Sequence, residues 1–84
     1  MRYAVYLNVA YKPSIKDPEG ETISKDLLAR LGHDVAVRSG KCLVLYVDAP
    51  SPEDAEKTAL YIAREARLGN PHVHVIQVVR IEEA

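Results

Sequence analysis

The sequence predicts an α+β domain with the order β-α-β-β-α-β, in which two helices cover one face of a mainly antiparallel four-stranded sheet. Three observations point to this class: residues 2–12 alternate as a strand does, two proline-containing segments resemble helix starts, and a Ser-Gly pair joins two β-prone runs. The 84 residues make one domain, 1–84, which buries only about three fifths of the surface of its unfolded form. Oligomerisation is a common way to stabilise so small a domain.

The first expected strand, residues 2–12, has one strongly apolar side and ends at Pro13, which has no amide hydrogen to donate. A helix start is predicted next, because Asp17 can accept free amide hydrogens and Pro18 suits the first helical turn. The helix is expected to end at Gly32 as a left-handed C-cap. Its apolar stripe consists of Ile23, Leu27, Leu28 and Leu31.

Strands two and three are expected at residues 35–38 and 41–47. The two-residue turn between them, Ser39-Gly40, contains the glycine that tight hairpins favour. These two strands are therefore predicted to pair as a hairpin.

A second helix is predicted from Ser51 as N-cap and Pro52 as first helical residue, and it is expected to end at Gly69-Asn70-Pro71. Its expected buried stripe has mostly small side chains, which would let the helix lie close to the sheet. The stripe consists of Ala55, Ala59, Ile62 and Ala66. The last strand is expected at residues 73–81.

The expected sheet is apolar on both sides, although two helices cover only one face. An antiparallel sheet with one face in water usually carries polar residues there. Monomers rarely expose apolar patches beyond a few hundred Å², so the second face is expected to pack against another copy of the chain, as a dimer or tetramer. The residues expected on this oligomer face are Tyr6, Cys42, Val44, Tyr46, Ile76 and Val78.

Composition excludes several classes of partner. The net charge is -1, with 48% hydrophobic and 27% charged residues, so the basic footprint of a nucleic-acid-binding protein is absent. No apolar run approaches the roughly 20 residues that cross a membrane. A single cysteine excludes an intrachain disulfide, and the first residues lack a signal-peptide core, so a cytoplasmic protein is expected.

Three side chains that could carry chemistry have simpler structural interpretations. Cys42 lacks a base nearby in the sequence and is expected to be a buried thiol. His72 and His74 lie on the same side of a strand, but a usual metal site needs three or four ligands and no cluster supplies the others. No metal site and no catalytic residue are therefore predicted.

One binding hypothesis stays open beside the structural one. Arg38 and Lys41 bracket the glycine turn and could hold a phosphate through their charges and backbone amides. In that case the chain would be a ferredoxin-like regulatory module that binds a small ligand. The carboxylates of Asp17 and Glu19, by contrast, are explained by the helix start alone.

An ordered set of motifs spans residues 15 to about 73. It consists of Ile15-Lys16-Asp17-Pro18-Glu19-Gly20, Ile23, Leu31-Gly32, Val37-Arg38-Ser39-Gly40-Lys41 and Asn70-Pro71. In order and approximate spacing this set resembles the PurS family, the small subunit of phosphoribosylformylglycinamidine (FGAM) synthase in purine biosynthesis.

The resemblance implies a subunit without catalytic residues or a bound cofactor of its own. It would join a synthetase subunit, PurL, and a glutaminase subunit, PurQ, in a complex that uses ATP, magnesium and glutamine to convert formylglycinamide ribonucleotide to its amidine. In that family the small subunit is needed for assembly and for the passage of ammonia between active sites, and it forms a dimer or larger oligomer.

The resemblance also places the partner contacts, at the helix start, the hairpin and the entry to the last strand. The matching residues are Asp17, Pro18 and Gly20, then Arg38, Gly40 and Lys41, and finally Asn70 and Pro71. Two features depart from the family pattern: the connection from Gly32 to Arg38 is short, and His72 and His74 replace apolar and acidic residues.

Overall fold

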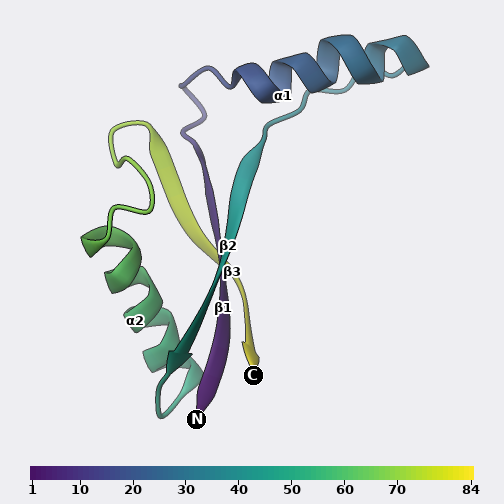
Figure 1. The fold of residues 1–84 in the computed structure, drawn as a ribbon. Helices are drawn as coiled ribbons and strands as arrows, with labels where there is room; N and C mark the ends of the chain where they lie inside the picture. The colour runs from purple at the N-terminus through teal and green to yellow at the C-terminus, as the bar shows by residue number, and fades with distance from the viewer.

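Three antiparallel strands and one packed helix form the body of the protein, and a second helical segment projects from it (Figure 1). The computed structural model describes residues 1–84. The strands are β1 (Arg2–Tyr11), β2 (Gly40–Asp48) and β3 (His74–Glu83), and the helices are α1 (Pro18–Thr22) and α2 (Pro52–Glu65). Helix α1 continues without a break into a π-helical segment, Ile23–Leu28, and a 3-10 turn, Ala29–Leu31.

Strand β1 lies at the centre of the sheet, in the order β2-β1-β3, and pairs antiparallel with both neighbours. Val5 is opposite Leu45 on one side and Ile81 on the other. The register of β1 with β3 shifts between Tyr6 and Leu7, where Val79 is the extra residue of a β-bulge. The sheet therefore has three strands where four were predicted.

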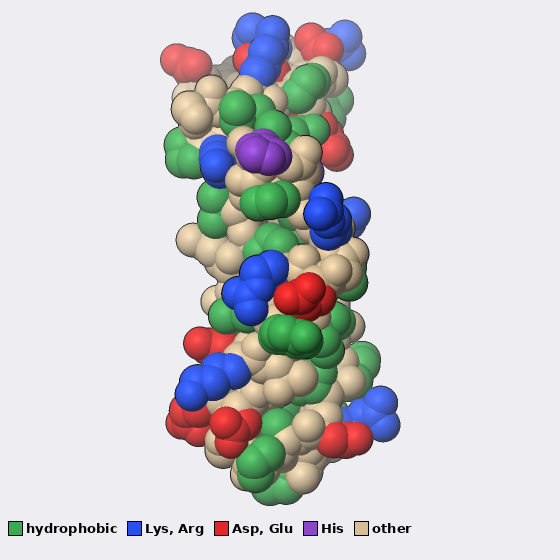
Figure 2. All heavy atoms as spheres, turned by 90° about the vertical axis from the view of Figure 1, so that its left-hand side faces the viewer, with side chains coloured by type: hydrophobic (Ala, Val, Ile, Leu, Met, Phe, Trp, Pro, Cys, Tyr) green, Lys and Arg blue, Asp and Glu red, His purple; other side chains and the backbone are tan.

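Helix α2 covers one face of the sheet and forms the core with it (Figure 1). Ala55, Ala59 and Ala63 are buried against the apolar side of β1. The predicted stripe of small side chains is confirmed, except that Ala63 takes the inward position expected for Ala66, which is exposed. The outer surface of α2 carries charged side chains (Figure 2).

Both ends of α2 are fixed by local hydrogen bonds. The predicted N-cap is confirmed, since the side chain of Ser51 accepts a hydrogen bond from the amide of Asp54. The helix ends before Gly69, because Arg67 adopts the left-handed conformation with φ 53°. The amide of Leu68 then donates to the carbonyl of Ala63 and closes the helix end.

The predicted hairpin at Ser39-Gly40 is wrong. Residues 33–39 form no strand and instead run back along the projecting helix, where the hydroxyl of Ser24 donates to the carbonyl of Val35. The chain needs this stretch to return from the helix tip to the sheet. Strand β2 then begins at Gly40 and pairs with β1.

The projecting segment, residues 18–39, is called the arm below. Its helix does not lie on the sheet, so the prediction of two helices on one face is also wrong (Figure 1). Leu27 and Leu31 of its apolar stripe are 56% and 73% exposed. The arm makes the molecule elongated, with dimensions of 48 × 26 × 14 Å.

The sheet face opposite α2 is uncovered and is called the open face below. Tyr6, Val44 and Tyr46 lie on it as predicted, whereas Cys42 also lies there but as an exposed thiol rather than a buried one. Ile76 and Val78 do not belong to it, because both pack toward the core on the α2 side. The β3 residues on the open side include Val75, opposite Ala10, and the bulge residue Val79 is 59% exposed.

The close approach of α2 to the sheet leads to the first prediction. Ala59 is fully buried, so Ala59→Leu should push the helix from the sheet and lower the free energy of unfolding by about 1–3 kcal/mol. The matched variant Ala66→Leu adds the same side chain to an exposed position and should change it by less than about 0.5 kcal/mol. Urea unfolding followed by circular dichroism measures both, and equal effects would contradict the packing described.

Candidate partner-binding site

Asp17 connects three segments of the chain at the root of the arm. Its side chain is only 1% exposed and accepts a hydrogen bond from the amide of Gly20 at 3.1 Å, which confirms it as the predicted N-cap. It also accepts hydrogen bonds from the amide and the hydroxyl of Ser39, 22 residues along the chain. The carboxylate therefore holds together the two segments of the chain that enter and leave the arm.

Arg38 stabilises the same junction from the other side. Its Nη2 donates to the carbonyls of Lys12 and Ile15 at 2.9 and 2.8 Å, within the connection that leaves β1. The guanidinium is thus engaged by the main chain. Of the two cations that could hold a phosphate at this turn, Arg38 is therefore already occupied and only Lys41 remains.

Two glycines allow the backbones at this junction to approach closely. A Cβ atom at Gly20 would lie 2.4 Å from the carbonyl oxygen of Val37, and one at Gly40 would lie 2.7 Å from Oδ1 of Asn8. The first distance is far too short beside a main-chain oxygen, so only glycine fits at position 20, whereas the Asn8 side chain would have to move to admit a larger residue at position 40. Four of the residues predicted as partner contacts, Asp17, Gly20, Arg38 and Gly40, therefore have a role within the chain.

The hydrogen bonds at the junction hold the pKa of Asp17 below its ordinary value. The amide of Ser39 contributes most, followed by the amide of Gly20, while partial desolvation opposes them. The Ser39 hydroxyl and the charge of Arg38 lower the pKa further. Asp17 is therefore ionised in the folded protein near neutral pH.

The turn at Asn70-Pro71 leads into β3 at the same end of the sheet. Oδ1 of Asn70 accepts from the amide of His72, and the amide of Asn70 donates to Nδ1 of His74. The ring of His74 lies 5.0 Å from that of Tyr11. His74 thus has a structural role in the turn, while His72 is exposed.

The segments that carry the predicted contact residues flank one end of the sheet, where β1 ends and β2 and β3 begin. A hollow of about 200 Å³ lies between the arm root and the end of α2, smaller than usual for a ligand pocket. Its lining includes Tyr11, Glu19, Ser39, Lys41, Leu68 and His74. Lys41 lies on the α2 side of the sheet, paired with Val9, and is exposed.

The open face is a second candidate contact surface, apolar at its centre and charged toward one end. The guanidinium carbons of Arg80 and Arg2 lie 5.6 and 5.8 Å from the ring centres of Tyr6 and Tyr46. The hydroxyl of Tyr6 donates to Glu82, whose carboxylate raises the pKa of that phenol. Sequence alternation missed Val75 and Val79 on this face, because a bulge has no clear sequence signal.

Comparison with known proteins now assigns the chain to a family. Residues 4–82 match the family model for PurS, phosphoribosylformylglycinamidine (FGAM) synthase. The chain belongs to the PurS family. The resemblance seen in the sequence motifs is thereby confirmed.

Solved structures of the family share the whole fold. PurS of Thermus thermophilus is 33% identical, with 100% of this chain and 99% of that chain covered and a TM-score of 0.85. The PurS subunit of Thermotoga maritima phosphoribosylformylglycinamidine synthase is 29% identical, with 100% and 93% covered and a TM-score of 0.81. Methanocaldococcus jannaschii PurS, 21% identical over 98% of both chains with a TM-score of 0.80, has the same fold.

PurS is a subunit of FGAM synthase, an enzyme of purine biosynthesis. A search of curated proteins gives no match. Neither helix of the chain has the length and apolar character needed to span a membrane.

The lowered pKa of Asp17 leads to the second prediction. A carboxylate whose folded pKa lies below its unfolded value of about 4 stabilises the fold above pH 4, and the effect is lost as the pH falls through the folded pKa. Asp17→Asn replaces one accepting oxygen with a donor that faces other donors. The variant should therefore have a lower urea midpoint than the parent at pH 7, and the difference should shrink below about pH 4.

Asp26→Asn is the matched control, because Asp26 is exposed on the arm. It should leave the urea midpoint unchanged at both pH values. A difference between Asp17→Asn and the parent that stays constant from pH 7 to pH 3 would contradict the role given to the carboxylate.

Proposed function

We propose that this chain is the non-catalytic small subunit of an FGAM synthase complex and joins its synthetase subunit, PurL, to its glutaminase subunit, PurQ. The observation that carries the proposal is the match to the PurS family over residues 4–82, together with a shared fold over the whole chain. The complex would act in the cytoplasm, where the partner subunits use ATP, magnesium and glutamine. The chain itself would bind none of them.

The use of its polar residues supports a structural role. Asp17 and Arg38 are hydrogen-bonded within the junction of the arm, and Nδ1 of His74 is hydrogen-bonded within the turn before β3. A residue that acts on a substrate needs free groups within reach of the reacting atoms. These residues instead make one end of the sheet rigid.

A rigid bridge suits the transfer of ammonia between two active sites. Transfer requires that the two catalytic subunits keep one orientation and that the path is shielded from water. The arm, the sheet end and the open face give the chain contact surfaces that point in different directions (Figure 1). One small subunit could therefore touch several neighbours at once.

Self-association through the open face completes the proposal. Val44, Tyr46 and Val79 are 39%, 58% and 59% exposed on one side of a three-stranded sheet. Apolar side chains of this size are usually buried, and a domain of 84 residues gains stability when a second copy covers them. The chain would then enter the complex as a dimer or tetramer.

Reconstitution tests the role in the complex. Omitting this chain from a mixture with PurL and PurQ should abolish the glutamine-dependent synthase rate, while the rate with ammonium salt should remain, because only the transfer of ammonia needs the bridge. Amidine formation with each nitrogen source is the measurement. A glutamine-dependent rate that is equal with and without the chain would overturn the proposal.

A pair of tyrosine variants tests the open face. Tyr46→Glu places a charge on this face and should weaken self-association by about tenfold to 100-fold, measured by light scattering over a dilution series. Tyr61→Glu makes the same change on the outer surface of α2, where Tyr61 is 57% exposed, and should have no effect. The same dissociation constant for both variants would show that the open face is not the self-association surface.

A further inference from the structure

We infer that the cations at the arm end of the sheet bind an acidic surface on a protein partner in the synthase complex. These cations, called the basic rim below, are the half-buried Lys12 and the exposed Lys41, Arg64 and Arg67, with His72 beside them. The inference rests on the proposed function and adds the chemistry by which a partner would recognise the chain.

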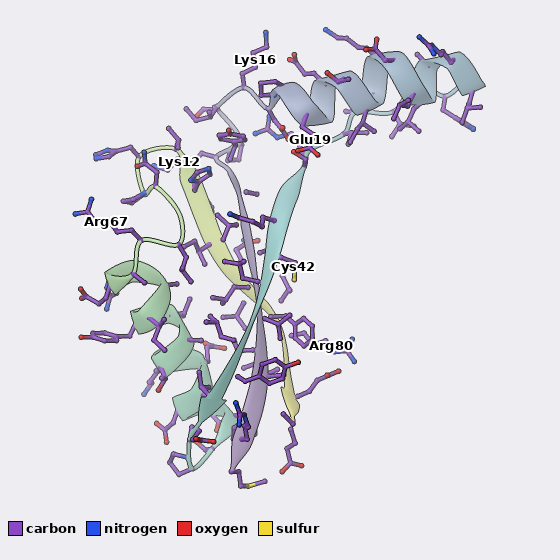
Figure 3. The ribbon with its side chains drawn as sticks, in the orientation of Figure 1. Lys12, Lys16, Glu19, Cys42, Arg67 and Arg80 are labelled. Carbon is purple, nitrogen blue, oxygen red and sulfur yellow. The ribbon has the colours of Figure 1, made fainter.

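The basic rim gathers residues that are far apart in the sequence. Arg64, Arg67 and His72 line a hollow of about 500 Å³, together with Glu65, Asn70 and Pro71. Leu68, next to Arg67, lines the neighbouring hollow together with Lys41. Lys12 follows the end of β1, and its amide donates to the carbonyl of Val73 beside His72. Figure 3 places Lys12 and Arg67 at this end of the sheet.

The two ends of the sheet differ in charge, although the net charge of the chain is only -1. The far end, where β2 and β3 finish and α2 begins, is rich in carboxylates. They are Asp48, Glu53, Asp54, Glu56, Glu82 and Glu83. On the α2 face, blue side chains flank the histidine near the arm, and red ones lie at both ends of the molecule (Figure 2). A field of this kind orients a partner of opposite charge.

The cations of the basic rim make no internal ion pair, and Arg64 alone lies over an aromatic ring, that of Tyr61. The ion pairs of the chain are Lys16–Glu21 at the root of the arm and Arg80–Glu82 on β3. No carboxylate lies within 4 Å of the charged groups of Lys12, Lys41 or Arg67. Their charges are therefore available to carboxylates of another molecule.

The backbone at Arg67 gives an independent reason to assign a role outside folding. Arg67 is the one residue other than glycine with a positive φ, 53°, at a helix end where glycine is favoured. The negative end of the α2 dipole favours a nearby cation, but Arg64 in the last turn already provides one. A strained arginine that makes no internal ion pair is better explained by binding than by stability.

The spread of the cations favours a protein surface over a single phosphate. A phosphate site brings several donors to one point. Here Lys41 lines one hollow, Arg64 and Arg67 line another, and Lys12 lines neither. Arg38, at the root of the arm, donates to main-chain carbonyls. An extended acidic surface can contact all of these cations together.

A charge-reversal pair tests the inference on the reconstituted complex. The triple variant Lys12→Glu, Lys41→Glu and Arg67→Glu should bind PurL or PurQ about 100-fold more weakly than the parent at low salt. Parent affinity should fall as salt is raised, and that of the variant should change little. As a matched single pair, Lys41→Glu in the basic rim should weaken binding, whereas the control Lys57→Glu, on the outer surface of α2, should bind like the parent.

Arg67→Gly separates binding from stability. Glycine relieves the left-handed backbone, so the melting temperature should rise while affinity for the partner falls about tenfold. An unchanged affinity would overturn the role of Arg67, whatever happens to the melting temperature. Saturable binding of inorganic phosphate or ATP to the isolated chain, lost in the triple variant, would replace the acidic protein partner with a phosphate ligand.

The outcomes distinguish this inference from the proposed function. If the parent binds neither PurL nor PurQ, both fail. If the parent binds and the triple variant binds as tightly as the parent, only the inference about the basic rim fails. Circular dichroism and light scattering on each variant confirm that fold and oligomer size match those of the parent.

Discussion

The buried carboxylate of Asp17 is the interaction on which the arrangement of the chain depends. It binds the amide that starts the arm and the amide and hydroxyl of Ser39 where the arm returns. Without it, nothing but the Arg38 contacts and the chain itself would fix the arm relative to the sheet. Because β2 begins directly after Ser39, the same carboxylate also sets where the second strand starts to pair with β1. One side chain thus both caps a helix and fixes the position at which a strand begins.

The two faces of the sheet differ in what covers them and in the side chains that they carry. On the α2 side, alanines bring the helix close and bury β1 almost completely. On the open face, aromatic and aliphatic side chains stand beside arginines and a glutamate. Such a mixture suits contacts between subunits, where an apolar centre and a charged rim supply stability and orientation separately. A chain this short relies on that second face for part of its stability.

Sequence reasoning found the elements whose signals are local. The caps at Asp17 and Ser51, the prolines that follow them and the left-handed Gly32 were all predicted and observed. What failed depends on distant contacts: residues 35–38 have the composition of a strand, but they return along the arm. The bulge at Val79 reversed the faces of Ile76 and Val78. At the site, sequence motifs located Asp17, Gly20 and Arg38. They could not reveal that Asp17 also binds Ser39 or that Arg38 donates to the main chain that leaves β1.

The projecting arm has a consequence for how the protein behaves in solution. The radius of gyration is 15.7 Å, whereas a compact domain of this length would have about 12 Å. Under the same scaling, 15.7 Å corresponds to a compact protein of about twice the chain length. A single copy would therefore migrate through a sizing column much as a globular dimer does. The elution volume of this protein therefore does not give its mass. Its oligomeric state has to be determined by a method that measures mass directly, such as light scattering.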